Sequence, residues 1–280
     1  MVNHAQPISN FDNLQDQYEL FLFDQFGVLH DGVKAYAGMQ SMIAKLKHQG
    51  KRIAVISNSG KRASVNADRI RKMGFGDELI DQVYTSGEVA WLRFKSLVLG
   101  QRNGSLKLFF LGNGNDRSAF AGLPMEEAEL PELADIIVIA GMGPVQRTNE
   151  EYEKLLRKAA SIDVNAFCTN PDNVSLVGDG SVTMGPGGIA SIYRNLGGSC
   201  EYVGKPFPEI YTHILKDSGI PAHKVVCIGD SVEHDIVGAS RAGCHSVLVR
   251  TGIHEQLTDS ELDNLFDQSG VRPNYILENR

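Results

Sequence analysis

The stretch Phe21-Leu22-Phe23-Asp24-Gln25-Phe26-Gly27-Val28-Leu29 decides the fold predicted for this chain. A short apolar run ends in a carboxylate and a glycine follows three residues later, which is typical of a buried parallel strand that delivers a reactive group to a sheet edge. Ligands of open α/β sheets bind outside the carboxyl ends of the strands, so Asp24 is a candidate nucleophile. Gly27 allows a tight turn whose N–H groups face an anion. An aspartate after a strand is more often a turn former, so the remaining chain must supply support.

The composition indicates a globular protein of 280 residues, which suits two modest domains. No apolar run reaches the ~18 residues of a membrane span, and residues 1–17 are too polar for a secretory signal, so we expect a cytoplasmic protein without a membrane partner. The net charge of −7 without a basic stripe disfavours nucleic acid as a partner. Because the chain contains no C-x-x-C pair, the following cysteines are expected to be buried free thiols: Cys168, Cys200, Cys227 and Cys244.

Short apolar runs alternate with segments of helical periodicity, which predicts strand–helix–strand units of a parallel sheet. The elements expected first are a helix over residues 35–49, a strand over 51–56 that ends in Ser57-Asn58-Ser59-Gly60, a helix over 62–73 and a strand over 82–84. A second α/β pattern then begins near residue 88, with strands over 106–111, 136–140 and 164–168 and a helix over 149–160. Its glycine-rich turns lack the third glycine of a dinucleotide fingerprint, so we interpret them as ordinary turns.

The first pattern resumes near residue 185, with helices over 189–196 and 209–217, strands over 224–228 and 245–249, and a final edge strand over 275–277. Thr258 and Glu261 predict a capping box at the start of the last helix. The predicted fold is therefore α/β. A Rossmann-like parallel-sheet core comprises residues 1–87 and 185–280, and residues 88–184 form an inserted α/β cap, or lid.

Four of the predicted strand ends and helix starts carry polar groups: Asp24, Ser57, Lys205, and Asp230 with Asp235 five residues on. Their order and types resemble the haloacid dehalogenase-like (HAD) superfamily of phosphatases, and the lid position resembles its class IIA subgroup, which has a C2-type cap. Further segments similar to that subgroup are Thr85-Ser86-Gly87, Asn170-Pro171-Asp172, the glycine-rich helix start before Ile189, and Gly204-Lys205-Pro206. The resemblance covers nearly the whole chain.

The resemblance implies an aspartyl-phosphate on Asp24, which water then hydrolyses. A phosphate dianion repels a carboxylate, so a divalent cation must bridge them, and Mg²⁺ suits this task. The implied metal ligands are Asp24, the main-chain carbonyl of Phe26, and Asp230, with Asp235 orienting Asp230 or its waters. The implied phosphate-binding residues are Ser57, Lys205, and the backbone of Gln25, Phe26, Gly27 and Asn58. The implied catalytic residues are Asp24, Ser57 and Lys205.

Each of these residues also has a structural interpretation. Ser57 and Asn58 can form an N-cap pair, Lys205 can be a solvated loop cation, and Asp235 can interact with a helix dipole in the first turn. We interpret His30-Asp31 as a structural turn. Asn170 and Asp172 are expected to shape the lid instead of touching the substrate.

Phe26 departs from the superfamily pattern, in which the residue two beyond the nucleophile is usually a second aspartate that protonates the leaving group and activates water. A phenyl ring does neither, and positioned acid–base catalysis typically contributes about 10² to 10⁴ in rate. Three interpretations remain. The chain is a Mg²⁺-dependent phosphatase that is slow or restricted to good leaving groups, a phosphate-ester binding protein with a regulatory role, or a metal-independent dehalogenase. The third conflicts with the Gly229-Asp230 motif, which such relatives lack.

The expected partner of the site is a small phosphorylated metabolite. A homodimer formed through the lid is implied by the resemblance alone, without any residue pattern that supports it.

Overall fold

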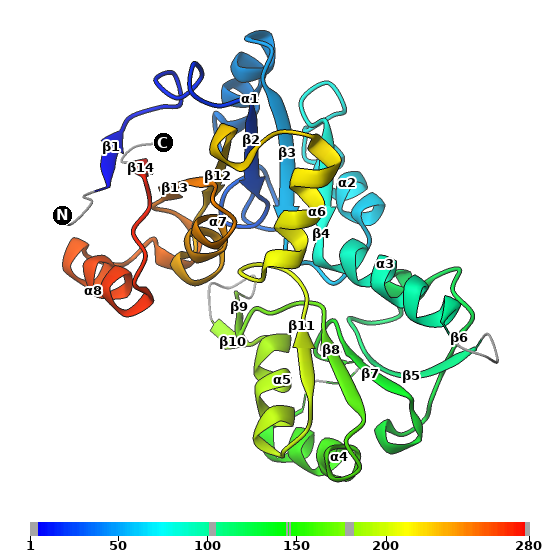
Figure 1. Cartoon of the computed structure of the whole chain (residues 1–280). Coiled ribbons are helices and arrows are strands. Elements are labelled where there is room, and N and C mark those ends of the chain that lie inside the picture. The colour runs from blue at the N-terminus through cyan, green and yellow to red at the C-terminus, as the bar shows by residue number, and fades with distance from the viewer. Residues whose placement is uncertain (1–4, 101–104, 144, 146, 177–181, 278–280) are drawn as a thin grey trace. The chain divides into compact units, whose positions relative to one another are not determined.

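The computed structural model describes residues 5–100, 105–143, 145, 147–176 and 182–277 (Figure 1). The chain divides into two compact units. The first unit comprises Met1–Ser57, Ala67–Tyr84 and Lys205–Arg280, and the second comprises Asn58–Asn66 and Thr85–Gly204. Each unit contains its own parallel sheet, so the α/β fold with a Rossmann-like parallel-sheet core is confirmed.

The first unit is built on a seven-stranded sheet in the order β1-β14-β13-β12-β2-β3-β4. Its strands are β1 (Gln6–Ile8), β2 (Leu20–Asp24), β3 (Arg52–Ser57), β4 (Gln82–Thr85), β12 (Val225–Gly229), β13 (His245–Val249) and β14 (Tyr275–Leu277). The pairs from β1 through β14, β13, β12 and β2 to β3 are all parallel. Every residue of β2 is buried, as expected for a continuous apolar run in a sheet covered on both faces.

Strand order creates a switch point beside β2. From β2 the chain continues through β3 and β4 on one side, whereas β12, β13 and β14 lie on the other side. Asp24 pairs with Ile56 of β3, and Ile228 of β12 pairs with Phe23. The carboxyl ends of β2, β3 and β12 therefore stop at nearly the same level, at the position where open α/β sheets bind ligands.

The helices of the first unit connect these strands. They are α1 (Met39–His48), most of α2 (Ala63–Lys72), α6 (Pro208–Ser218), α7 (Val237–Arg241) and α8 (Asp259–Ser269), with a π-helical turn η4 (Val232–Ile236) and 3₁₀ turns η3 (Ala222–Lys224) and η5 (Gly252–His254). The capping box predicted for the last helix is confirmed, because Thr258 accepts a hydrogen bond from the Glu261 backbone and Glu261 accepts one in return.

The second unit contains a five-stranded sheet in the order β11-β8-β7-β5-β6 and a two-stranded antiparallel sheet, β9 and β10. Its strands are β5 (Leu106–Leu111), β6 (Met125–Glu127), β7 (Ile136–Ile139), β8 (Asn165–Cys168), β9 (Val174–Leu176), β10 (Val182–Met184) and β11 (Cys200–Tyr202). Its helices are α3 (Ser86–Leu99), α4 (Asn149–Ser161) and α5 (Pro186–Asn195), with 3₁₀ turns η1 (Ser118–Phe120) and η2 (Pro131–Leu133). Helices α4 and α5 bury Tyr152, Leu156, Ile189 and Tyr193 in one apolar cluster with the sheet.

Two features differ from the sequence-based expectation. The final strand β14 is not at the sheet edge, because β1 pairs with its outer side through the register of Ile8 with Leu277. A three-residue strand is too short to show periodicity, so the sequence did not indicate β1. The second difference is that α5 and β11 lie in the second unit, whereas the expected core began again at residue 185. The cause is packing, since Ile189, Ala190 and Tyr193 are fully buried against that unit's strands.

All four cysteines are free, as predicted, and three of them are buried while Cys200 is half-buried. Among the described residues, no helix combines the length and the apolar character needed to cross a membrane.

Candidate active site

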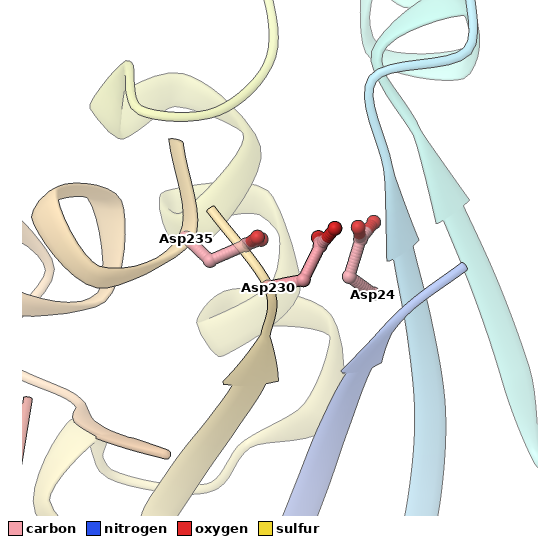
Figure 2. A group of neighbouring side chains, drawn as sticks. All are labelled: Asp24, Asp230 and Asp235. Atoms are coloured by element: carbon pink, nitrogen blue, oxygen red, sulfur yellow. The ribbon is translucent and has the colours of Figure 1, made fainter. Parts of the chain in front are cut away.

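Three aspartate side chains converge at the carboxyl ends of β2 and β12 (Figure 2). Asp24 is the last residue of β2, Asp230 directly follows β12, and Asp235 lies in the π-helical turn η4. One carboxylate oxygen from each lies within 4.8 Å of the others, and the three residues are only 8%, 5% and 3% exposed. Strands distant in the sequence therefore bring together three carboxylates that water hardly reaches.

Lys205 supplies the positive charge beside this cluster. Its Nζ donates hydrogen bonds to Asp24 Oδ1 at 2.6 Å and to Asp235 Oδ1 at 2.7 Å. The lysine is 3% exposed, which excludes the interpretation of a solvated loop cation. A buried ammonium is stable only when carboxylates or other acceptors compensate its lost hydration, and both of these carboxylates do so.

Burial dominates the electrostatics of the cluster. It raises the pKa of Asp24 to about 7, although the Lys205 ammonium acts in the opposite direction. Burial also raises the pKa of Asp230 well above its ordinary value, reinforced by the charges of Asp24 and Asp235. For Lys205, burial lowers the pKa, but the two carboxylates outweigh this effect and hold it above its ordinary value. Three carboxylates thus share one ammonium, and the cluster carries excess negative charge whenever all three are ionised.

The excess charge and the oxygen donors together fit a divalent cation. Mg²⁺ takes oxygen ligands, binds through few carboxylates and retains several waters, and its two positive charges would balance what Lys205 leaves uncompensated. Asp24 and Asp230 are the carboxylates suited to hold it. Asp235 is less suited, because Lys205 occupies its Oδ1 and the Ser231 N–H donates to its Oδ2 at 3.1 Å. Asp235 therefore fixes the lysine and the turn that follows β12.

Glycines allow the backbone to approach the carboxylates closely. A Cβ on Gly27 would lie 2.1 Å from Asp230 Oδ2, and a Cβ on Gly252 would lie 1.8 Å from the same oxygen. Both glycines have positive φ values, +81° and +60°, which other residues rarely adopt. A side chain at either position would displace Asp230.

The loop after β13 completes the surroundings of Asp230. The Ile253 N–H donates to Asp230 Oδ2 at 2.8 Å, and the Thr251 hydroxyl donates to the Gly27 carbonyl at 2.7 Å. This loop was not among the predicted site residues. The available signal was a Thr-Gly pair one residue after an apolar strand, which reaches the same sheet edge as Asp230.

Ser57 and Asn58 follow each other at the end of β3 but belong to different units. Ser57 is buried and comes one residue after Ile56, the partner of Asp24, so it reaches the same sheet edge. The Asn58 side chain instead donates to Asp172 Oδ1 at 2.8 Å within the second unit. The expected phosphate-binding residues are therefore not all in one unit.

The residues after Asp24 differ in exposure. Gln25 is 3% exposed, and its side-chain nitrogen has no hydrogen-bond partner among the described residues. Phe26 is 37% exposed. Asp31 accepts hydrogen bonds from the N–H groups of Val33 and Lys34, as expected for a structural turn. Asn170 likewise accepts a hydrogen bond from the Asp172 N–H, which shapes its own loop.

A Rossmann-like parallel sheet with buried aspartates at its switch point is the arrangement of a class of enzymes whose active sites are built from aspartates. The model described as haloacid dehalogenase-like hydrolase matches residues 21–125, and a second HAD hydrolase model matches residues 202–279. The chain belongs to the haloacid dehalogenase-like superfamily, so the prediction of a hydrolytic enzyme is confirmed.

Individual proteins of known name or structure are similar over nearly the whole chain. Chronophin from Bos taurus is 27% identical over 266 residues, which cover 92% of this chain and 89% of chronophin. A haloacid dehalogenase-like hydrolase from Brucella suis 1330 superposes with a TM-score of 0.82 at 25% identity, covering 97% of this chain and 99% of that one. A p-nitrophenyl phosphatase from Archaeoglobus fulgidus superposes with a TM-score of 0.71 at 25% identity, covering 94% and 97%.

Proposed function

We propose that this hydrolase cleaves small phosphate monoesters by transferring the phosphoryl group to Asp24, with Mg²⁺ in the acidic cluster. The observation that carries the proposal is the buried ammonium of Lys205, 2.6 Å from Asp24 and 2.7 Å from Asp235, beside a third carboxylate on Asp230. The similarity to a p-nitrophenyl phosphatase supports the same reaction class. Within this proposal, the first unit is the catalytic core and the second unit is the cap, with the class IIA arrangement.

The residues of the chain divide the chemical work. A carboxylate oxygen of Asp24 attacks phosphorus, the bond to the leaving oxygen breaks, and the ester's electron pair departs with that oxygen. Lys205 holds Asp24 ionised and in place through its hydrogen bond to Oδ1. Ser57 and the N–H groups after Asp24 bind the phosphoryl oxygens. Mg²⁺, when bound, neutralises charge on the phosphoryl group and lets the anion approach the carboxylate. Water then hydrolyses the aspartyl-phosphate.

Phe26 limits both steps. Its side chain supplies no proton to the departing oxygen and accepts none from the attacking water, so alcohols with a high pKa leave slowly. Substrates whose leaving groups depart as stable anions, such as aryl and acyl phosphates, need no such proton. The proposed enzyme is therefore slow on alkyl phosphates and faster on aryl or acyl phosphates.

A second candidate function is a regulatory protein that binds phosphate esters without cleaving them. The observation that favours it is the same phenyl ring at position 26, because the ring leaves the site without an acid–base group that turnover needs and binding does not. Metal-independent dehalogenation is disfavoured because Asp230, a buried carboxylate beside Asp24, is suited to hold a cation that such a reaction does not need.

Hydrolysis of p-nitrophenyl phosphate with Mg²⁺ and with a chelator separates these functions. We expect turnover with Mg²⁺ and none with the chelator or in Asp24→Asn. The control Asp68→Asn changes an exposed carboxylate of α2 and should retain turnover. Tight binding of phosphate without turnover supports the regulatory function. Metal-independent release of halide from a 2-haloacid supports the dehalogenase, and either result overturns the proposal.

A further inference from the structure

Phe26 is an exposed residue within a buried stretch of the chain beside the site. From Leu20 to His30 every residue is buried except Phe26, which is 37% exposed. Among the described residues, it is the one aromatic side chain in the group of exposed large hydrophobic residues. At 37% exposure the ring leaves part of its surface in water and forgoes the corresponding burial free energy, about 25 cal/mol per Å² of apolar surface.

The ring is fixed in its exposed position by its own loop. The His30 ring meets it edge to face, with centroids 5.9 Å apart and an interplanar angle of 89°. Gly32 leaves room on another side, because a Cβ there would lie 2.8 Å from Phe26 Cε2. The backbones of the two ring-bearing residues form a β-bridge, and the Gly27 N–H donates to the His30 carbonyl at 3.0 Å. The ring therefore rests on a preformed support.

The same loop connects the ring to the acidic cluster. Two residues of chain span at most about 7 Å, so the Phe26 backbone lies within that distance of Asp24. The next residue, Gly27, approaches Asp230 so closely that a Cβ on it would lie 2.1 Å from the carboxylate. A phosphoryl group on Asp24 would therefore lie beside the loop that carries the phenyl ring.

We propose that the exposed surface of Phe26 binds the leaving group of the substrate, and that this leaving group is an aromatic ring. The preferred substrates are then aryl phosphates. The inference rests on the proposed function and narrows it from good leaving groups in general to aromatic ones. Two aromatic rings in offset or edge-to-face contact contribute about 0.5–1.5 kcal/mol beyond the burial of their surface.

Paired substrates separate ring contact from leaving-group chemistry. p-Nitrophenyl phosphate and acetyl phosphate both have leaving groups that depart without protonation, but only the first is aromatic. We expect Phe26→Leu to lower the ratio of kcat/KM for p-nitrophenyl phosphate over acetyl phosphate about 2- to 12-fold, which is that energy range converted to rate. Phe26→Tyr keeps the ring and retains the ratio. Val33→Ala, which changes an exposed apolar residue of the same loop, also retains it.

Binding of two phosphonates gives a second readout that requires no turnover. Calorimetry should show that phenylphosphonate binds the Mg²⁺-loaded wild-type protein more tightly than methylphosphonate, and that Phe26→Leu reduces this preference. If phenylphosphonate binds more tightly than methylphosphonate but neither p-nitrophenyl phosphate nor acetyl phosphate is hydrolysed, the proposed function fails while the aromatic site stands. An unchanged ratio of kcat/KM together with equal affinities for the two phosphonates overturns the aromatic site, and Phe26 then only supports its loop.

Discussion

Phe26 and Lys205 are the two residues on which the proposed chemistry depends most. Phe26 stands two residues beyond the proposed nucleophile, in the place of an acid–base group. Lys205 stabilises the ionised form of that nucleophile. Lys205 acts through Asp24, whose burial raises its pKa to about 7.

Substitution of Phe26 by aspartate should restore the missing proton transfer. Alkyl phosphates need that proton most, so we expect Phe26→Asp to raise their kcat/KM by up to about 10² to 10⁴, with a much smaller gain for aryl phosphates. Phe26→Asn serves as the control, because its side chain is similar to aspartate in size and polarity but cannot act as a general acid or base. Equal gains on both substrate classes in steady-state assays would count against leaving-group protonation as the missing function.

Removal of the Lys205 charge should shift the pH dependence of turnover. The ammonium lowers the pKa of Asp24, and a carboxylate must be ionised to attack phosphorus. In Lys205→Met the pKa of Asp24 therefore rises, and the acidic limb of the kcat profile moves to higher pH. A profile recorded from pH 5 to 9 tests this, and a limb that stays in place or moves to lower pH contradicts the role given to Lys205.

At the residue scale, the candidate nucleophile and its partners could be predicted because each follows a readable local pattern. Asp24, Asp230 and Lys205 stand at a predicted strand end or helix start. Their pairing distances could not be predicted, and neither could the division of labour in which Asp235 holds Lys205 and the Ser231 N–H. The contacts of Lys205 depend on how segments far apart in the sequence meet in space, and the contact of Asp235 with Ser231 depends on the exact turn after β12.

At the scale of elements, the loop after β13 shapes the site through Gly252. We expect Gly252→Ala to reduce activity more than tenfold, because its Cβ would lie 1.8 Å from Asp230 Oδ2. Gly270→Ala is a matched control. Gly270 has a similar φ of +68°, against +60° for Gly252, but nothing lies within 4 Å of its Cβ position.

Both substitutions impose backbone strain on the order of 1 kcal/mol, and Gly252→Ala adds the displacement of Asp230, so denaturant unfolding should show the larger loss of stability for Gly252→Ala. Activity assays should show a loss only for Gly252→Ala. Equal activity in the two variants would mean that this loop does not position Asp230.

The strands were predictable to within a few residues where apolar runs were long. The strands predicted over residues 106–111 and 245–249 have the same bounds as β5 and β13. The three-residue strands β1, β6, β9, β10 and β11 were missed, because so short a segment seldom shows alternation or a helical period, and the longer helix α3 was missed as well. The pairing of β1 with β14 also joins the two ends of the chain, which no local pattern reveals.

At the scale of the whole molecule, the two-unit organisation was predictable, but one boundary was not. The sequence pattern predicts that the first unit resumes at residue 185, whereas α5 and β11 belong to the second unit. Packing explains the difference, since α5 buries its apolar side against α4 and the second sheet. The position of a helix in one unit or another depends on its partners and not on its own periodicity.

The acidic cluster predicts that divalent cations stabilise the whole protein. The charges of Asp24, Asp230 and Asp235 exceed that of Lys205, so Mg²⁺ binding to the folded state should raise the unfolding temperature. A cation at 100 times its Kd contributes about 2.7 kcal/mol. Thermal unfolding with Mg²⁺ and with chelator measures this. Asp230→Asn should lose most of the response, and a full response in that variant would place the cation elsewhere.

The most direct test of the central claim is the search for phosphate covalently attached to Asp24. Because Phe26 activates no water, the aspartyl-phosphate should accumulate during turnover of p-nitrophenyl phosphate. Rapid mixing should therefore show a burst of nitrophenolate close to the enzyme concentration, and acid-quenched digests should carry phosphate on the peptide that contains Asp24. Turnover without a burst, or with phosphate absent from that peptide, would contradict the account.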